Sequence, residues 1–138
     1  MPEKKTIERA QEDKREGKSA STQAGEFVKE EMHHIREGKH GAKSTKQAIA
    51  IGLSKARRSG VKLPPRRGQK AEGKKRGKVS AKRSRASEKA LERQPRKAAS
   101  RRSLSRQAKT VAHKRSKADR SRAAKKAART RKRERSKR

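Results

Sequence analysis

Residues 19–60 read SASTQAGEFVKEEMHHIREGKHGAKSTKQAIAIGLSKARRSG. This stretch contains two runs of residues with the periodicity of an α-helix. Its large apolar residues recur three or four positions apart, the spacing that places side chains on one face of an α-helix. Gly38 and Gly60 each follow such a run, and glycine readily takes the left-handed conformation that ends a helix. The stretch therefore predicts two amphipathic helices joined by a short loop.

The first of these helices is predicted to begin within Ser19–Thr22, where several side chains can cap its free amides, and to run to Glu37. The second helix has a clearer start, because Ser44-Thr45-Lys46-Gln47 matches a capping box, in which the two end residues satisfy each other's backbone donors. It is predicted to run to about Ser59. The apolar stripe of the first helix consists of five residues at helical spacing: Ala24, Phe27, Val28, Met32 and Ile35.

The apolar face of the second helix carries small residues at positions 48, 52 and 56, which allow another helix to approach closely. A shorter, mostly charged helix is predicted around Thr6–Glu16, ended by Gly17. Ile51 lies off the apolar face and is expected to meet this short helix or the segment Val61–Leu63. The hairpin core is predicted to bring together Phe27, Val28, Ile35, Ile49 and Leu53.

The composition of the chain changes at Leu63-Pro64-Pro65, a sequence that disfavours helix before the prolines. Residues 1–63 hold 15 basic and 9 acidic residues, a net charge of +6, whereas residues 64–138 hold 32 and 5, a net charge of +27. The fold class is therefore predicted to be all-α, with a small N-terminal helical hairpin or three-helix module in residues 1–63. Residues 64–138 form a Lys/Arg/Ala/Ser-rich polycationic tail.

The tail is predicted to be largely disordered on its own. Of the 138 residues, 25% are hydrophobic and 44% are charged, and the net charge of +33 leaves too little apolar surface to offset the entropy of ordering. Two segments favour helix: Ser87–Gln94, ended by Pro95, and the residues from about Ser100 onward, where Ala, Arg and Lys allow a long helix. Repulsion between like charges opposes that long helix until phosphates neutralise it.

Several classes of protein are excluded. A chain without cysteine has no disulfide and no thiolate metal site, and no stretch approaches the roughly 20 apolar residues of a membrane span. The first residues lack the apolar region of a signal peptide and are too acidic for a transit peptide. No nucleophile, base and orienting group form a recognisable arrangement, so neither an enzyme nor a cofactor is predicted. We expect a cytoplasmic, nucleoid-associated protein without membrane insertion.

Three histidines, His33, His34 and His40, lie near acidic residues in the sequence. Adjacent helical residues point about 100° apart, so His33 and His34 cannot easily share an ion. We therefore expect exposed histidines and no metal site. The two main helices also allow a helix-turn-helix interpretation, weakened by a loop longer than the usual three or four residues. In that interpretation four basic residues face DNA: Lys46, Lys55, Arg57 and Arg58.

The charge of the tail is the main functional signal. A polycation of this density is drawn to polyanions, among which nucleic acids are the commonest. Base stacking is not expected from a chain with one Phe and no Tyr or Trp. Sequence-independent DNA binding through phosphate neutralisation is therefore predicted. The residues predicted to make these contacts are Arg66, Arg67, Lys74, Lys75, Arg76, Lys82, Arg83, Arg101, Arg102, Lys114, Arg115, Lys125, Lys126, Arg131, Lys132 and Arg133.

Two alternatives stay open at the level of sequence. The first is a basic protein associated with RNA or with ribosomes. The second is a protein-interaction or dimerisation module that self-associates through its N-terminal helices and uses the tail only for localisation. The sequence does not distinguish DNA from RNA, and it gives no base preference, oligomeric state or phosphorylation state.

Residues 38–58, GKHGAKSTKQAIAIGLSKARR, resemble a segment of a family of small, basic bacterial proteins with no established activity. Residues 19–28, SASTQAGEFV, are similar to the same family, so the resemblance covers residues 1–65. It implies a bacterial cytoplasmic protein with a boundary near Pro64, and it assigns no functional residue. By composition alone, the tail resembles the Lys/Ala/Arg tails of linker histones and of histone-like bacterial proteins.

Overall fold

The computed structural model of the protein describes residues 1–65 and 80–136, and every regular element in these two ranges is a helix. The predicted all-α class is therefore confirmed. The chain divides into two compact units, Met1–Ser103 and Leu104–Arg138, each described by itself. The elements in chain order are α1 (Lys4–Arg15), α2 (Ala20–Glu37), α3 (Thr45–Arg58), α4 (Ala81–Glu92), the 3-10 turn η1 (Arg96–Ala99), α5 (Arg101–Lys114) and α6 (Lys117–Arg135).

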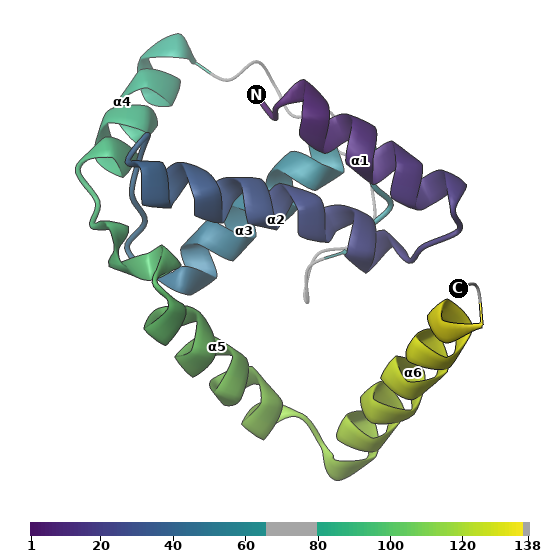
Figure 1. The fold of residues 1–138 in the computed structure, drawn as a ribbon. Helices are drawn as coiled ribbons and strands as arrows, with labels where there is room; N and C mark the ends of the chain where they lie inside the picture. The colour runs from purple at the N-terminus through teal and green to yellow at the C-terminus, as the bar shows by residue number, and fades with distance from the viewer. Residues whose placement is uncertain (66–79, 137–138) are drawn as a thin grey trace. The chain divides into compact units, whose positions relative to one another are not determined.

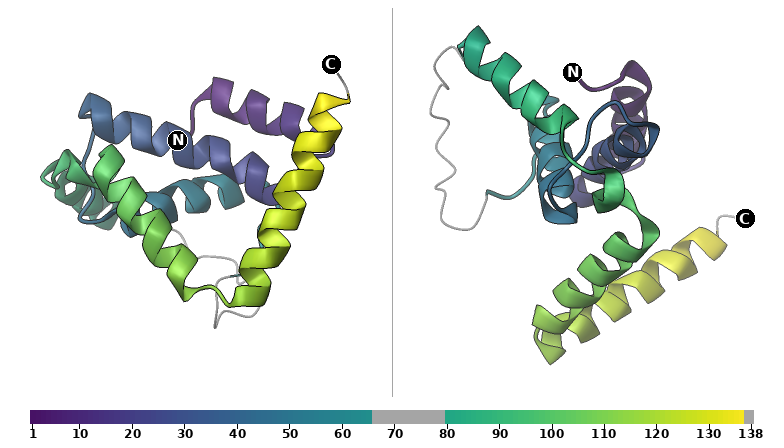
Figure 2. Two further views of the ribbon diagram at one scale, coloured as in Figure 1. Left: turned by 60° about the horizontal axis from the view of Figure 1, so that its bottom comes forward. Right: turned by 90° about the vertical axis from the view of Figure 1, so that its left-hand side faces the viewer.

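The first unit is built around α2, which packs against both α1 and α3. Figure 1 shows α2 crossing α3 and running beside α1, and the views in Figure 2 agree. Phe27 and Ile35 of α2 are fully buried, as the sequence predicts, whereas Val28, Ile49 and Leu53 are only half-buried. The core around Phe27 also takes in Ala10, Ala24, Ala56 and Val61.

Val61 joins this core with Leu63 packed against it, so residues 61–63 fold back onto the helices. Both residues contact the cluster that contains Ala10 of α1. The core of the module is therefore shared by three helices and the segment that follows α3. Ile51 takes no part in that cluster. It lines a hollow on the outer face of α3 instead, because the α3 residues that face the core are the small ones at 48, 52 and 56.

Both main helices begin and end close to where the sequence predicts. The Ser19 side chain accepts a hydrogen bond from the Thr22 amide at 3.4 Å, and Gly38 ends α2 with φ of 83°, a left-handed conformation that favours glycine. Ser44 caps α3 by accepting from the Gln47 amide at 3.2 Å. The reciprocal half of the capping box differs, because the Gln47 side chain accepts from the Lys43 amide at 2.8 Å rather than from Ser44.

Small residues let α2 and α3 come close together. Ala48, Gly52 and Ala56 are buried along one side of α3, as predicted. A methyl group built on Gly52 would lie 2.7 Å from the Cα of Val28, a distance that only a shift of the helix backbones can relieve. The close approach therefore depends on the missing side chain at position 52.

We expect Gly52→Ala to destabilise the module, because the added methyl group meets backbone atoms of α2. Overpacking of this kind costs about 1–3 kcal/mol. Gly25→Ala is the matched control, since Gly25 lies within α2 with nothing within 4 Å of the added methyl group. Alanine at that position favours helix by up to about 1 kcal/mol. Thermal unfolding should therefore move in opposite directions for the two variants, and a Gly52→Ala protein as stable as the parent would contradict the close approach.

The prediction of a largely disordered tail is wrong for the residues that the structure describes. Residues 81–135 are mostly helical, because Ala, Arg and Lys favour helix strongly enough to outweigh the repulsion that was expected to prevent it. The helix expected at Ser87–Gln94 starts earlier, at Ala81, and ends before Pro95. The expected long helix is two helices, since Ser116 breaks the run and caps α6 by accepting from the Asp119 amide at 3.1 Å.

The segment after α4 packs on the loop between α2 and α3. The Gly41 amide donates to the Leu91 carbonyl at 2.9 Å, and the Thr45 hydroxyl donates to the Ala98 carbonyl at 2.7 Å. Ala99 is fully buried, and its carbonyl accepts from the Arg36 side chain at 3.0 Å. These contacts explain why the first compact unit extends to Ser103. The domain boundary at Pro64 stays a prediction, and it was drawn without these contacts between the segment after α4 and the α2–α3 loop.

Candidate nucleic-acid interface

The second unit carries an unusual density of positive charge. Its 35 residues, Leu104–Arg138, include 16 Lys and Arg against 2 acidic residues, a net charge of +14. Within α6 the ratio is ten basic to two acidic residues, and every residue of the helix is exposed. The apolar residues of α6 are all alanines. The helix thus offers positive charge around its circumference and no apolar face for a core.

Intramolecular ion pairs do little to neutralise this charge. Of the ion pairs among the described residues, all but one involve acidic residues between Glu3 and Glu37 in the first unit. In residues 104–136 the structure places a single pair, Arg122 with Asp119 at 2.7 Å. The other basic groups of this range face solvent, where a polyanion can reach them.

The residues predicted to contact nucleic acid are spread over several parts of the chain. Arg66, Arg67, Lys74, Lys75 and Arg76 lie outside the described residues. The others are exposed on α4, on α5 with the residue that follows it, and on α6. The prediction omitted five equally exposed residues of α6, which the same charge pattern would have found: Lys117, Arg120, Arg122, Arg129 and Arg135.

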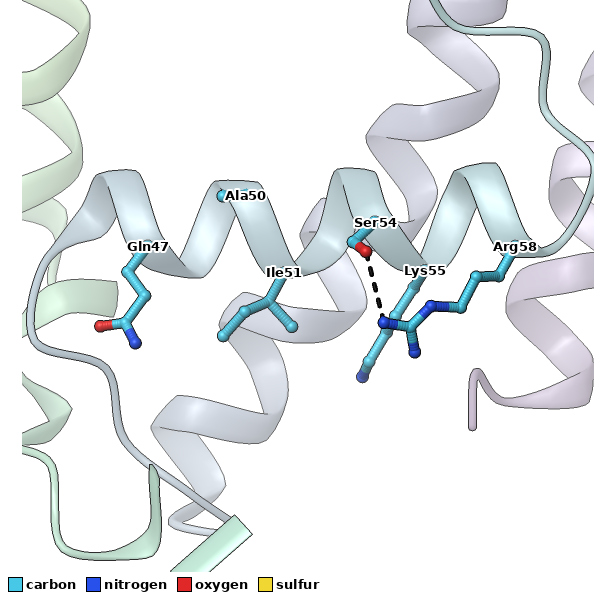
Figure 3. A pocket seen from close by; sticks show the side chains of 6 residues that line it. All are labelled: Gln47, Ala50, Ile51, Ser54, Lys55 and Arg58. Atoms are coloured by element: carbon cyan, nitrogen blue, oxygen red, sulfur yellow. Dashed lines mark hydrogen bonds between the residues drawn. The ribbon is translucent and has the colours of Figure 1, made fainter. Parts of the chain in front are cut away.

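A hollow of about 300 Å³ lies on the outer face of α3 (Figure 3), lined by Gln47, Ala50, Ile51, Ser54, Lys55 and Arg58. Arg58 donates to the Ser54 hydroxyl across it at 3.5 Å. Lys55 is committed elsewhere, because its Nζ lies 2.7 Å from Glu31. The hollow is open and lacks converging free charges, so it does not form an anion site.

The helix-turn-helix interpretation gains no support from the geometry. Of its four proposed DNA contacts, Lys55 pairs with Glu31, and Arg57 donates to the Pro64 carbonyl at 3.2 Å. Seven residues separate α2 from α3, which is longer than the turn of that motif. Base reading by α3 is therefore not favoured.

Polar side chains also gather inside the first unit, near the end of α2. Glu31 is fully buried, with His40 Nε2 3.0 Å from its Oε1 and Lys55 Nζ 2.7 Å from its Oε2. His34, one turn further along α2, is 8% exposed, and its Nε2 donates to Glu3 Oε1 at 2.9 Å. The cluster joins residues from the N-terminus, α2, the following loop and α3.

The pKa of the Glu3 carboxyl group is lowered, mainly by the hydrogen bond from His34 and next by the hydrogen bond from Lys39. The expectation of exposed histidines is confirmed for His33, whose side chain is 67% exposed. It is wrong for His34, which packs inside the module, and for His40, whose side chain is 19% exposed. Glu31 is not among the acidic partners predicted from the sequence. The signal was the spacing of three between Glu31 and His34, which places both on one face of a helix.

A model of a family of unknown function, DUF6496, matches residues 14–67, a range that includes α2, α3 and the loop between them. No curated protein and no solved structure matches the chain. This similarity assigns no activity, and the resemblance to a bacterial family stays a prediction. Within the part of the chain that the structure describes, none of the helices combines the length and the apolar character needed to cross a bilayer.

Proposed function

We propose that the protein binds DNA without sequence preference by neutralising backbone phosphates with its C-terminal helices. The observation that carries this proposal is the net charge of +14 in Leu104–Arg138, in which the described residues form one internal ion pair. Basic residues with so few acidic partners repel one another, and a bound polyanion relieves this repulsion. Binding of this kind suits the compaction or protection of DNA, as in a nucleoid.

The charge density of α6 is of the right order for a duplex. At 1.5 Å per residue its 19 residues span about 28 Å. Duplex DNA of that length carries about 17 phosphate charges, and the net charge of +8 on α6 offsets about half of them. Phosphate contacts position a protein on DNA without reading its sequence, so unrelated sequences should bind within a few-fold of each other.

The alternative of a self-associating module has less support. Among the described residues, the large apolar side chains that stand exposed are Met1 and Val111. Obligate interfaces resemble a protein core cut in half and need more apolar surface than these two residues offer. RNA carries the same phosphates as DNA, so an RNA-associated role is an outcome of the experiments rather than a separate proposal.

The proposal is tested by removing four charges from α6 in the full chain, with Lys125, Lys126, Arg129 and Arg131 changed to Gln. Each lost phosphate contact lowers the salt dependence of binding by about one unit of slope, so we expect the slope of log K against log salt to become shallower by about 3–4. Fluorescence anisotropy with labelled duplexes measures both the affinity and the slope.

The matched control removes the same four charges from exposed positions of α1. We expect this variant to keep nearly all of the slope, because α1 belongs to the module rather than to the polycation. Equal effects in the two variants would mean that net charge alone drives binding, and the proposed interface would be wrong. Much tighter binding to RNA than to duplex DNA at equal salt would redirect the proposal to RNA. The control positions are Lys4, Lys5, Lys14 and Arg15.

A further inference from the structure

The carboxylate of Glu31 is the most unusual polar group in the described residues. Its side chain is fully buried, and among the described residues neither of its oxygens has a partner with hydrogen-bond geometry. Lys55 and His40 lie within ion-pair distance but at poor angles. A buried carboxylate without hydrogen bonds is costly unless a cation compensates it. Lys55 is such a cation for Oε2, whereas Oε1 faces His40, so the compensation of Oε1 depends on what lies between these two groups.

The tautomer of His40 is fixed by its neighbour. The Gly41 carbonyl lies 3.1 Å from His40 Nδ1 and can only accept, so Nδ1 carries the proton. In the neutral ring, the lone pair of Nε2 is then left 3.0 Å from Glu31 Oε1. Both atoms are electron-rich, so they repel each other at this distance unless a cation lies close to both. That cation is either a proton on Nε2 or a metal ion.

The geometry favours the metal ion over the proton. The contact between His40 Nε2 and Glu31 Oε1 lacks the direction of a hydrogen bond, so a proton on Nε2 would not point at the oxygen. Two ligands of a tetrahedral ion lie about 3.3 Å apart when each is 2.0–2.1 Å from the metal, and their lone pairs point at the ion rather than at each other. The observed separation of 3.0 Å is close to that value.

A third ligand lies beside these two. Ligand atoms of Glu31, His34 and His40 all lie within 4.8 Å of one another. Glu3 holds the ring of His34 through its hydrogen bond, as carboxylates do for metal-binding histidines. The longest separation has to shorten by about 1.5 Å for a tetrahedral ion, and rotation of side chains supplies a movement of that size.

We propose that Glu31, His34 and His40 form a binding site for a divalent transition-metal ion of the Zn²⁺ class. One carboxylate and two imidazoles are a recurrent ligand set for such ions, and a water molecule takes the fourth position. Lys55 Nζ lies 2.7 Å from the second oxygen of Glu31, and Glu3 accepts a hydrogen bond from His34, so each ligand has a charged neighbour outside the site.

The local charge suits a cation although the whole chain is strongly basic. Glu3, Glu30 and Glu31 contribute three negative charges here, against the positive charges of Lys39 and Lys55. The site also lies near the C-terminus of α2, where the helix dipole favours positive charge. A divalent ion therefore enters a locally negative environment inside a protein that otherwise repels cations.

The ion would fasten the loop between α2 and α3 to α2, because His40 belongs to that loop. The same loop holds the segment after α4, through hydrogen bonds from Gly41 to Leu91 and from Ala42 to Pro95. A bound ion should therefore stabilise the first unit as a whole. This inference is independent of the DNA-binding proposal, since none of the three ligands lies in the basic helices.

The test uses full-length protein freed of metal with a chelator and titrated with ZnCl₂ alone. We expect calorimetry to show that one Zn²⁺ binds per chain. We also expect a higher melting temperature in the presence of Zn²⁺. His40→Gln should weaken this binding by about 100-fold or more, since loss of even a supporting group costs about 10–100-fold. The matched control, His33→Gln with His113→Gln, leaves only the two proposed histidine ligands and should bind Zn²⁺ within a few-fold of the parent.

Binding that is absent in the parent, or equally weakened by the control, would overturn the site. Glu31→Gln provides a second variant that keeps the shape of the side chain and should also lose the ion. If both variants fail to fold, Co²⁺ added to the parent protein decides the question. A tetrahedral site gives intense visible absorption that Zn²⁺ abolishes, whereas only the weak spectrum of the hydrated ion would reject the proposal.

Discussion

The full-length protein is expected to lose about 10⁵-fold in affinity for duplex DNA when the salt concentration rises from 50 to 200 mM. With 32 basic residues in positions 64–138, at least about ten phosphate contacts are expected, each adding about 0.9 to the slope of log K against log salt. The expected slope is therefore steeper than about −9. The cause is release of the counterions that the duplex holds before the protein replaces them.

Removal of residues 104–138 is expected to reduce this slope sharply, because it deletes 16 basic residues while it keeps the first compact unit intact. The cut after Ser103 is better placed than one at Pro64, since it spares the residues that pack on the α2–α3 loop. A shallow slope for the full chain, or strong sequence preference retained by residues 1–103, would mean that the module reads bases and that the tail is secondary.

The elements that local chemistry controls were predictable from the sequence. Gly38 ends α2 and Ser44 caps α3 as expected, because a left-handed turn and a capping hydroxyl depend on a few adjacent residues. The burial of Phe27 and Ile35 followed from helical periodicity in the same way. Agreement at this level confirms the all-α class and the two amphipathic helices α2 and α3.

Features that depend on distant residues were not predictable. The contact of Thr45 with Ala98 joins positions 53 residues apart, and no local pattern marks it. Glu31 and His34 share one face of α2, but His40 joins them only when the loop turns back over α2, which the spacing of the histidines does not show. The tail differs from the prediction for another reason: its helix propensity outweighs the repulsion between its charges, and the spacing of Ser116 and Asp119 marks a helix start.

Phe27→Ala is expected to destabilise the first unit by about 3–5 kcal/mol, the usual cost of removing a buried phenylalanine. The ring is fully buried and packs in the core with Ala10, Ala56 and Val61, so it joins α1, α2, α3 and the residues after α3. A small domain has only about 5–15 kcal/mol of stability in all. Hydrogen exchange of the amides in α1–α3 should therefore become fast throughout, and Phe27→Leu should give an intermediate result.

The control for this variant is Val111→Ala, which shortens an exposed side chain of α5 and should leave amide exchange in α1–α3 unchanged.

The Phe27→Ala protein also tests whether DNA binding depends on the folded first unit. If the basic helices alone neutralise phosphates, the Phe27→Ala protein should keep most of its salt slope for DNA binding while its module is open. Loss of the slope together with the module would show that the folded first unit presents the phosphate contacts, and the interface would then have to be sought on α1–α4.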